Sequence, residues 1–550
     1  RQGFRPIIRH QCGAKAIKLI YATGQATPVR EEPVATSDQQ RFVLTSDEIL
    51  KLASWALQIE EHYSKRAGRD VPMDLEWAKD GQSGELFIVQ ARPETVHSLQ
   101  PNQMTFDLYE IEGERETLVT GKSVGDKVGL GSVRVIRSAA ELHHFRAGEV
   151  LVAPMTDPDW EPVLKSAAAV VTDHGGRTCH AAIVSRELGI PCVVGTGDGT
   201  SRLATHQDVT VSCAEGDEGF VYRGRLDVKH DVIDPSQLPT PCVPVMLNVG
   251  NPSVAFRLGM LPSAGVGLAR IEFIVSSLIG VHPMALVHPE RTDLATQQRI
   301  RELTACYDSP REFFIDRMAT GVAQIAAAFF PRPVIVRMSD FKTNEYAGLL
   351  GGNAFEPQES NPMIGFRGAS RYYNERYREG FALECAAMLR ARQEMGLTNI
   401  KLMIPFCRTL GEGRQVIEEL AKNGLRRGEH GLELYVMCEI PNNVILAEQF
   451  SELFDGFSIG SNDLTQLTLG IDRDSDLLAP LFDERDPGVK EMIRMVIEKA
   501  HKHGRKVGIC GQAPSDHPEF GEFLVKCGID TISVTHDALP ELTRRLAVKH

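Results

Sequence analysis

The sequence contains no apolar run approaching the roughly 20 residues that a helix needs to cross a bilayer. Its first residues lack the charged and then apolar pattern of a secretory signal. The lysines and arginines are scattered rather than gathered into a basic stripe, and the net charge is −13, which argues against a nucleic-acid-binding surface. These absences predict a protein with neither membrane nor nucleic-acid partners, and we expect it in the cytoplasm.

The cysteines form no recognisable framework. Eleven cysteines occur in 550 residues, without a paired CxxC motif, a pattern more typical of reduced thiols than of disulfides or structural zinc. The length and the 42% hydrophobic composition predict several domains rather than one core. Because the chain begins at Arg1 in a stretch that reads like the middle of a domain, we expect an N-terminally truncated fragment.

The apolar spacing divides the chain into a front piece, a middle domain and a long C-terminal region. A helical pattern over residues 45–62 precedes two short apolar runs, MDLEWAKD and ELFIVQARPET, which predict a hairpin. Short strands and glycine-rich turns are expected over residues 116–225. Over residues 244–550, eight short β-rich runs alternate with amphipathic helices, which predicts a closed (β/α)8 barrel. These runs are PVMLN, GVGLAR, PVIVRMS, IKLMIP, LYVMCE, GFSIGS, KVGIC and DTISVT.

One histidine has the sequence context of a phosphate carrier. In TDHGGRTCHAAIVSRELGIPCVVG, Gly175 and Gly176 predict a loop, and a helix is expected from His180 to the breakers Gly189 and Pro191. The free N–H groups and the dipole at such a helix start favour an anion and keep an imidazole neutral. His180 is therefore a candidate nucleophile for phosphate, although a capping or core histidine stays open as the alternative.

Polar residues stand at the predicted C-terminal ends of the barrel strands, where barrels of this kind carry their active sites. Arg270 and Arg337 suit planar anions, Glu439 and Asp463 suit Mg²⁺, and Cys510 can exchange a proton. Each residue alone has a structural alternative, as a surface ion pair or a buried packing residue. Together they predict a pocket for a small anion with Mg²⁺.

These motifs are similar to those of a known family. GGRTCHAAIVSRELGIP resembles the signature of the swivelling phosphohistidine domain of phosphoenolpyruvate-utilising enzymes. GVGLARIEF, VRMSDFKTNEY, NPMIGFRG, MCEIPNN, GFSIGSNDLTQLTLGIDR and GICGQAPSD resemble, in the same order, the barrel that binds phosphoenolpyruvate and pyruvate. The resemblance implies that His180 is the phosphorylated histidine, that Cys510 is the proton donor, and that Glu439 and Asp463 hold Mg²⁺.

The same resemblance implies further site residues. The implied substrate-binding residues are Arg270, Arg337, Glu439, Gly460, Ser461, Asn462 and Asp463. Arg367 and Arg473 match additional active-site arginines, with a structural ion pair as the alternative. Thr178 matches the threonine on which a regulatory kinase and phosphorylase acts in phosphoenolpyruvate synthases, where a phosphate would repel the phosphoryl group, and its alternative is an N-cap. Cys179 is expected to pack.

The front piece distinguishes among relatives. MDLEWAKD and FIVQARPETV resemble the last hairpin of the ATP-grasp domain in phosphoenolpyruvate synthases and pyruvate phosphate dikinases, which implies that Glu76, Gln90 and Arg92 contact nucleotide and metal. On the residues alone they would be the solvated face of a hairpin. The hairpin argues against enzyme I of the sugar phosphotransferase system, and the dikinase stays open, although DHGGRTCHAAIVSRELGIP and GICGQAPSD favour the synthase.

The implied organisation is an α/β chain of three domains. Residues 1–98 are the C-terminal part of an ATP-grasp domain, 99–115 a linker, 116–225 the phosphohistidine domain, 226–243 a second linker, and 244–550 the barrel. The two linkers are the candidate hinges for swinging.

The implied activity converts pyruvate, ATP and water to phosphoenolpyruvate, AMP and phosphate through phospho-His180, a gluconeogenic step, and a homodimer is expected. Two other classes are weaker. A phosphocarrier with an inactive barrel is disfavoured because Glu439, Asp463 and Cys510 are all present, and a Mg²⁺-dependent lyase would leave His180 without a role.

Overall fold

The computed structural model forms two compact units, one of Arg1–Asn102 with Leu238–His550 and one of Gln103–Gln237. We treat each unit separately. The residues that the structure describes are 4–10, 15–22, 29–39, 41–94, 106–113, 115–125, 127–156, 160–175, 180–215, 218–234, 237–471, 478, 481–536 and 538–547.

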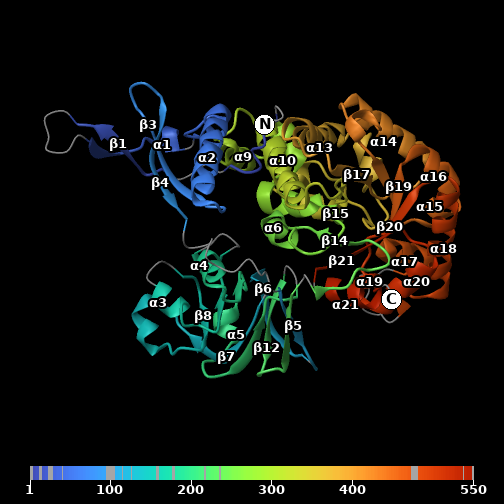
Figure 1. The fold of residues 1–550 in the computed structure, drawn as a ribbon. Helices are drawn as coiled ribbons and strands as arrows, with labels where there is room; N and C mark the ends of the chain where they lie inside the picture. The colour runs from blue at the N-terminus through green and yellow to red at the C-terminus, as the bar shows by residue number, and fades with distance from the viewer. Residues whose placement is uncertain are drawn as a thin grey trace. The chain divides into compact units, whose positions relative to one another are not determined.

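The larger unit contains a closed barrel of eight parallel strands in chain order (Figure 1). The last strand pairs with the first, which closes the barrel. All eight runs predicted from the sequence are strands, so the (β/α)8 prediction is confirmed. The strands are β14 Val245–Val249, β15 Val266–Arg270, β16 Val334–Arg337, β17 Ile400–Ile404, β18 Leu434–Cys438, β19 Gly456–Ile459, β20 Lys506–Ile509 and β21 Thr531–Val534.

Helices follow the strands and bury apolar faces against them. The 20-residue helix α10 (Pro310–Phe329) begins at Ser309, whose hydroxyl accepts the N–H of Glu312, and Pro310 fits the first turn because its missing N–H has no partner to lose there. The other helices of this region are α6 Ala255–Leu258, α7 Ile271–Ile274, α8 Pro283–Val287, α9 Leu294–Thr304, α11 Thr343–Ala347, α12 Ala369–Tyr372, α13 Arg378–Leu389, α14 Leu410–Lys422, α15 Pro441–Ile445, α16 Ala447–Leu453, α17 Ser461–Leu469, α18 Pro487–Lys502, α19 Ala513–Asp516, α20 Pro518–Lys526 and α21 Leu539–Arg545.

The front piece of the larger unit has the predicted helix and hairpin. Helix α2 (Ser46–Ala67) starts with a capping box, in which the hydroxyl of Thr45 and the carboxylate of Glu48 each accept the other residue's N–H. Strands β3 (Met73–Lys79) and β4 (Leu86–Pro93) pair antiparallel, as predicted. The remaining elements are β1 Ile17–Tyr21, β2 Val29–Pro33 and α1 Thr36–Gln39.

A polar and aromatic contact joins the front piece to barrel helix α10. The ring of His10 stacks on Phe42 at 4.5 Å, and its Nε2 lies 2.9 Å from Oδ2 of Asp316 across 306 positions of sequence. The same Asp316 oxygen accepts the hydroxyl of Tyr307 at 3.2 Å. The two parts of the larger unit, distant in sequence, are therefore tied by specific hydrogen bonds.

The smaller unit is built around a closed sheet of seven strands in the order β10-β6-β12-β11-β7-β8-β9. Its core is rich in valine, with Val133, Val150 and Val171 fully buried. Helix α4 (His180–Leu188) starts and ends where the sequence predicts, because Gly189 takes a positive φ of 66° that L side chains rarely adopt. The strands are β6 Thr117–Val124, β7 Val128–Val135, β8 Val150–Ala153, β9 Ala169–Thr172, β10 Cys192–Val194, β11 Asp208–Ser212 and β12 Glu218–Arg223, and the short helices are α3 Glu161–Leu164 and α5 Gly199–Arg202.

The two segments predicted as linkers contain regular structure. Strand β5 (Phe106–Ile111) and strand β13 (Val228–Ile233) pair antiparallel over six residues. The ring of Tyr109 stacks on that of His230, its cross-strand partner, at 4.6 Å. The incoming and outgoing connections of the smaller unit are thus bound to each other as a two-stranded ribbon.

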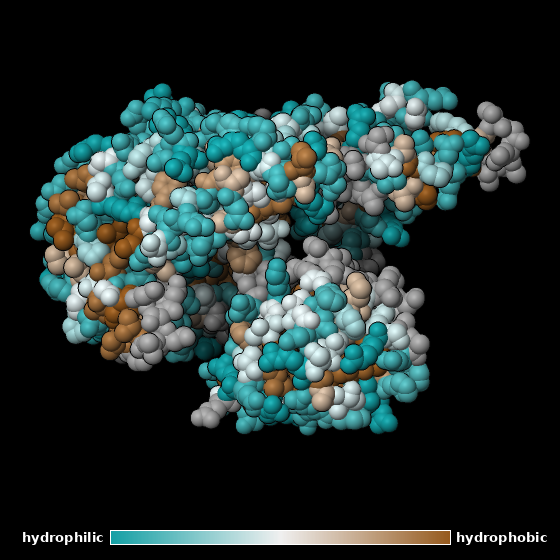
Figure 2. Space-filling model, turned by 180° about the vertical axis from the view of Figure 1, so that it is seen from behind, coloured by the Kyte–Doolittle hydropathy of each residue, from teal (hydrophilic) through white to brown (hydrophobic). Residues whose placement is uncertain are grey.

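The surface is mainly polar. Hydrophilic side chains cover most of the visible face, with hydrophobic residues in smaller groups between them (Figure 2). Within the described part of the chain, none of the helices combines the length and the apolar character that a membrane span requires.

Packing of the smaller unit predicts a specific intolerance at Gly129 of β7. A Cβ atom there would lie 2.3 Å from the carbonyl oxygen of Ala168, which is backbone and cannot rotate away. We expect Gly129→Ala to destabilise the smaller unit by about 1–3 kcal/mol, measured as a lower melting temperature by calorimetry. Gly81→Ala is the control, since nothing lies within 4 Å of its added Cβ. Equal melting temperatures for the two variants would contradict the packing argument.

Candidate active site

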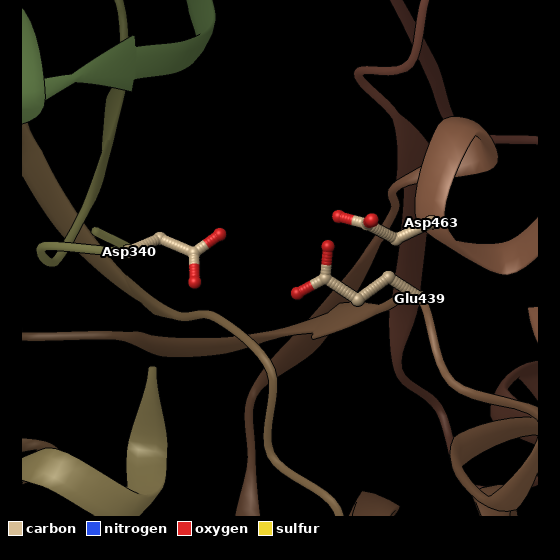
Figure 3. A group of neighbouring side chains, drawn as sticks. All are labelled: Asp340, Glu439 and Asp463. Atoms are coloured by element: carbon tan, nitrogen blue, oxygen red, sulfur yellow. The ribbon is translucent and has the colours of Figure 1, made fainter. Parts of the chain in front are cut away.

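The polar residues predicted at the barrel's strand ends converge on one region. Glu439 follows β18, Asp463 lies in the first turn of α17 after β19, and both side chains are buried. A third buried carboxylate, Asp340, follows β16 and faces them (Figure 3). Each of the three offers an oxygen within 4.8 Å of the others. Three converging carboxylates at this spacing are a candidate cation site.

Nearby positive charge stabilises the ionised form of this carboxylate cluster. Burial raises the pKa of Glu439 well above its usual range, and the carboxylates of Asp463 and Asp340 raise it further. Arg367 and Arg337 act in the opposite direction, because a neighbouring guanidinium favours the ionised carboxylate. The backbone N–H of Phe406 also donates to Glu439 Oε1 at 2.6 Å.

Two arginines bind the cluster through Asp340. Arg367 donates from Nε to Asp340 Oδ1 at 3.0 Å and from Nη2 to Oδ2 at 2.6 Å, a bidentate pair. Its Nη2 also donates to Asp463 Oδ2 at 3.3 Å, and its guanidinium lies 4.1 Å above the ring of Phe406. Arg337 lies with Nη1 3.4 Å from Asp340 Oδ2. Asp340 is therefore shared by both arginines.

Asp340 and Glu272 are site residues that the sequence interpretation missed. Glu272 accepts Arg337 Nη2 at 2.9 Å and the N–H of Asp340 at 2.7 Å, with the same Oε1. A usable signal was present: Asp340 comes three residues after Arg337 at the end of a predicted barrel strand, and Glu272 comes two residues after Arg270. Both positions fall on the face that carries active sites.

Cys510 lies in the barrel interior, just after β20. It packs with Leu268, Ile335 and Met403, and its Sγ lies 3.7 Å from the carbonyl oxygen of Ile459. Burial raises the pKa of Cys510 to about 11, although the nearby Arg337 and Arg270 lower it. At neutral pH the group is therefore a thiol that holds a proton to donate.

Two glycines allow the strand ends to approach closely. A Cβ on Gly511 would lie 1.7 Å from Ser461 Oγ, and one on Gly460 would lie 3.0 Å from Glu439 Oε2. Next to this contact, the side-chain oxygen of Asn462 accepts the N–H of Gln512 at 3.2 Å. The start of α17 is thus fastened to the segment that follows Cys510.

Not every predicted residue belongs to this cluster. Arg270 is exposed at the end of β15, where its backbone pairs in register with Arg337. Glu76 and Gln90 face each other across the β3–β4 hairpin, and Arg92 donates to Asp74 there at 2.8 Å. All three predicted nucleotide contacts are exposed side chains on the hairpin, not among the barrel strand ends.

Comparison of the sequence with known proteins identifies the family of this chain. A family model described as the PEP-binding domain of PEP-utilising enzymes, where PEP is phosphoenolpyruvate, matches residues 236–550. The chain belongs to the PEP-utilising enzymes. The mobile domain of PEP-utilising enzymes matches residues 145–216, and the AMP/ATP-binding domain of pyruvate phosphate dikinase matches residues 1–112.

Individual PEP-utilising enzymes match along the whole chain. It is 56% identical over 550 residues to a phosphoenolpyruvate synthase of Synechocystis sp., covering 100% of this chain and 67% of the relative. It is 50% identical over 543 residues to that of Escherichia coli, covering 98% of this chain and 67% of the relative. The AMP/ATP-binding domain model covers residues 1–112, and the chain spans about two thirds of the length of these relatives.

The phosphohistidine candidate of this PEP-utilising enzyme lies in the smaller unit. His180 is the first residue of α4, as the sequence predicts. Its side chain and the predicted residues Thr178, Cys179 and Arg473 lie outside what the structure describes. Gly175, the last described residue before α4, has a positive φ of 116°, which suits the predicted loop.

The hydrogen bonds from the Arg367 guanidinium to two carboxylates predict that lysine at this position lowers the free energy of unfolding. Arg367→Lys should destabilise the larger unit by about 2 kcal/mol or more, because a single ammonium cannot satisfy the buried Asp340 and Asp463 together. Urea unfolding measures this change. Arg494→Lys is the control: Arg494 also bridges two carboxylates, Glu491 and Glu498, but these side chains are largely exposed, so its loss of stability should be much smaller than that of Arg367→Lys. Similar losses in both variants would contradict the argument.

The thiol of Cys510 predicts a pH-dependent reactivity. Because its pKa is raised to about 11, the thiolate fraction and the rate of alkylation should rise about tenfold per pH unit between pH 7 and 10. Mass spectrometry of the Cys510 peptide after brief iodoacetamide treatment measures this, with the exposed Cys242 as reagent control and circular dichroism to verify folding. A rate that levels off near pH 8 would contradict the raised pKa.

Proposed function

We propose that this chain converts pyruvate, ATP and water to phosphoenolpyruvate, AMP and phosphate through a phosphohistidine at His180. The observation that carries the proposal is the identity of about one half to phosphoenolpyruvate synthases over essentially the whole chain. The buried carboxylate and arginine cluster supports it, because such a site suits a small anion with a cation. Nothing in the comparisons favours the dikinase or the enzyme I alternative, and the activity fits a gluconeogenic role.

Magnesium is the proposed cofactor of the barrel. Glu439 and Asp463 would hold it, since both are buried and their oxygens lie within reach of a common ion. When bound, Mg²⁺ supplies positive charge that stabilises the enolate form of pyruvate and the transferred phosphoryl group. Asp340 is engaged with two arginines, so we assign it to orienting them.

The protein side chains would bind and orient the substrate. Arg337 stays charged, since the carboxylates of Glu272 and Asp340 raise its pKa, and it would bind the anion together with the exposed Arg270. We include Arg367 with them, and Arg473 by its match to the family motif. Gly460, Ser461 and Asn462 would contribute contacts at the start of α17.

Cys510 would handle the proton of the pyruvate methyl group. Once phosphoenolpyruvate has given its phosphoryl group to His180, a thiol with a pKa of about 11 is suited to donating its proton to the methylene carbon of the remaining enolate, which gives pyruvate; in the synthetic direction the thiolate would accept a proton from the pyruvate methyl group. The positive charges of Arg337 and Arg270 lower the thiol pKa, which makes the thiolate more accessible.

His180 would carry phosphate between two half-reactions. Its place at the first position of the nine-residue helix α4 gives the phosphoryl group the positive end of the helix dipole. The nucleotide half-reaction would use Glu76, Gln90 and Arg92 of the hairpin. The domain boundaries follow the proposed 1–98, 116–225 and 244–550 division, with residues 99–115 and 226–243 as the connections about which the histidine domain swings.

Three features of the wider setting belong to the same proposal. Thr178 would be the target of a regulatory kinase and phosphorylase, since a phosphate beside His180 repels the incoming phosphoryl group. We propose a homodimer and a cytoplasmic location, as expected for a metabolic enzyme of this kind.

Phosphate transfer from phosphoenolpyruvate tests the proposal. The chain is incubated with Mg²⁺ and phosphate-labelled phosphoenolpyruvate, and an acid-labile, base-stable label is mapped by mass spectrometry. We expect label on His180, because both the barrel and the carrier must function to place it there. His180→Ala should carry none, while its binding of phosphoenolpyruvate stays within about twofold of wild type. A folded wild-type chain without label would overturn the assignment.

A further inference from the structure

Glu384 is a buried carboxylate that the proposed mechanism does not use. It lies on α13 with 0% of its surface exposed, and it accepts three hydrogen bonds. Ser339 Oγ donates to Oε1 at 2.6 Å, the backbone N–H of Ser339 donates to Oε2 at 3.2 Å, and the hydroxyl of Tyr377 donates to Oε1 at 2.7 Å. Two of these bonds hold one residue, Ser339.

Ser339 connects β16 to the active-site cluster. It follows the strand by two positions and directly precedes Asp340. Its N–H is held by Glu384, and its carbonyl oxygen accepts the hydroxyl of Tyr372 at 2.7 Å. The next N–H, that of Asp340, donates to Glu272 at 2.7 Å. The backbone that presents Asp340 is therefore fixed by side chains on several sides.

The placement of Asp340 in turn decides where two arginines point. Arg367 forms its bidentate pair with Asp340, and Arg337 lies 3.4 Å from the same carboxylate. A bidentate pair is directional, so a small shift of Asp340 misaligns the guanidinium groups that would receive the substrate.

We propose that Glu384 is a positioning residue for the anion site, acting through Ser339 to set Asp340 and thereby Arg337 and Arg367. The inference rests on the proposed function, since it assigns these arginines to the substrate. Glu384 touches no reacting atom itself. Its contribution is to keep the end of β16 in the one arrangement that aims both arginines into the site.

The hydrogen bonds, rather than the negative charge, are what this role requires. Burial raises the pKa of Glu384 to about 7, so near neutral pH a large share of the molecules hold a neutral carboxyl group there. An amide has a similar shape and can accept the N–H of Ser339 while its NH₂ donates to the hydroxyls, which are free to rotate. A leucine instead leaves the buried N–H of Ser339 without an acceptor, which costs about 1–3 kcal/mol and favours displacement of the backbone.

Phosphoenolpyruvate binding in the presence of Mg²⁺, measured by calorimetry, tests the proposal. We expect Glu384→Leu to weaken binding about tenfold or more, and Glu384→Gln to stay within about threefold of wild type. Asp455→Leu is the matched control: Asp455 Oδ2 accepts the N–H of Leu434 at 2.9 Å, at the opposite, N-terminal end of a barrel strand. We expect it to lower stability yet change binding by less than about twofold.

The outcomes separate a positioning role from a general loss of stability. Wild-type affinity in Glu384→Leu, or equal weakening in Asp455→Leu, would overturn the proposal. If Glu384→Leu does not fold, Ser339→Ala decides instead, since it removes only the hydroxyl half of the link; about threefold weaker binding supports the proposal and unchanged binding refutes it. Failure of wild type to bind phosphoenolpyruvate would instead count against the proposed function.

Discussion

The active-site end of the barrel depends on the balance between three buried carboxylates and two arginines, of which Arg367 is buried and Arg337 partly buried. Asp340, Glu439 and Asp463 would repel one another strongly in a region from which water is excluded. Arg337 and Arg367 offset part of that repulsion, and both engage Asp340. Arg367 also engages Asp463, so the two arginines are shared unequally among the three carboxylates. The same ion pairs thus stabilise the fold and fix the positions of the carboxylates and arginines relative to one another.

The barrel makes this balance achievable because parallel strands deliver side chains from distant sequence positions to one end. Arg337, Glu439 and Asp463 come from three different strand ends, spread over more than a hundred residues. Gly460 and Gly511 permit the backbone and side chains of neighbouring strand ends to approach more closely than any Cβ would allow. The cluster is consequently close-packed, with its side chains held by specific contacts between strand ends.

Periodicity and turn residues were sufficient to predict the barrel strands and helix α4. Eight apolar runs became the eight barrel strands, and the glycines around His180 gave helix α4 its limits, because both signals are local. The roles of Asp340 and Glu384 were missed because their signal is not local. Each depends on contacts with residues tens of positions away, whereas an isolated acidic residue in a sequence is normally interpreted as solvent-exposed. The pairing of β5 with β13 also escaped, since its two strands are separated by the whole smaller unit and each one alone resembles a connection.

The contact between His10 and Asp316 can form only late in synthesis of the chain. The two residues are 306 positions apart, and the smaller unit is translated in between. At about 5–20 residues per second, a ribosome needs roughly 15–60 seconds to make the partner that the front piece requires. The smaller unit has a closed sheet of its own, so it can fold before Asp316 is made, while the front piece still lacks this contact.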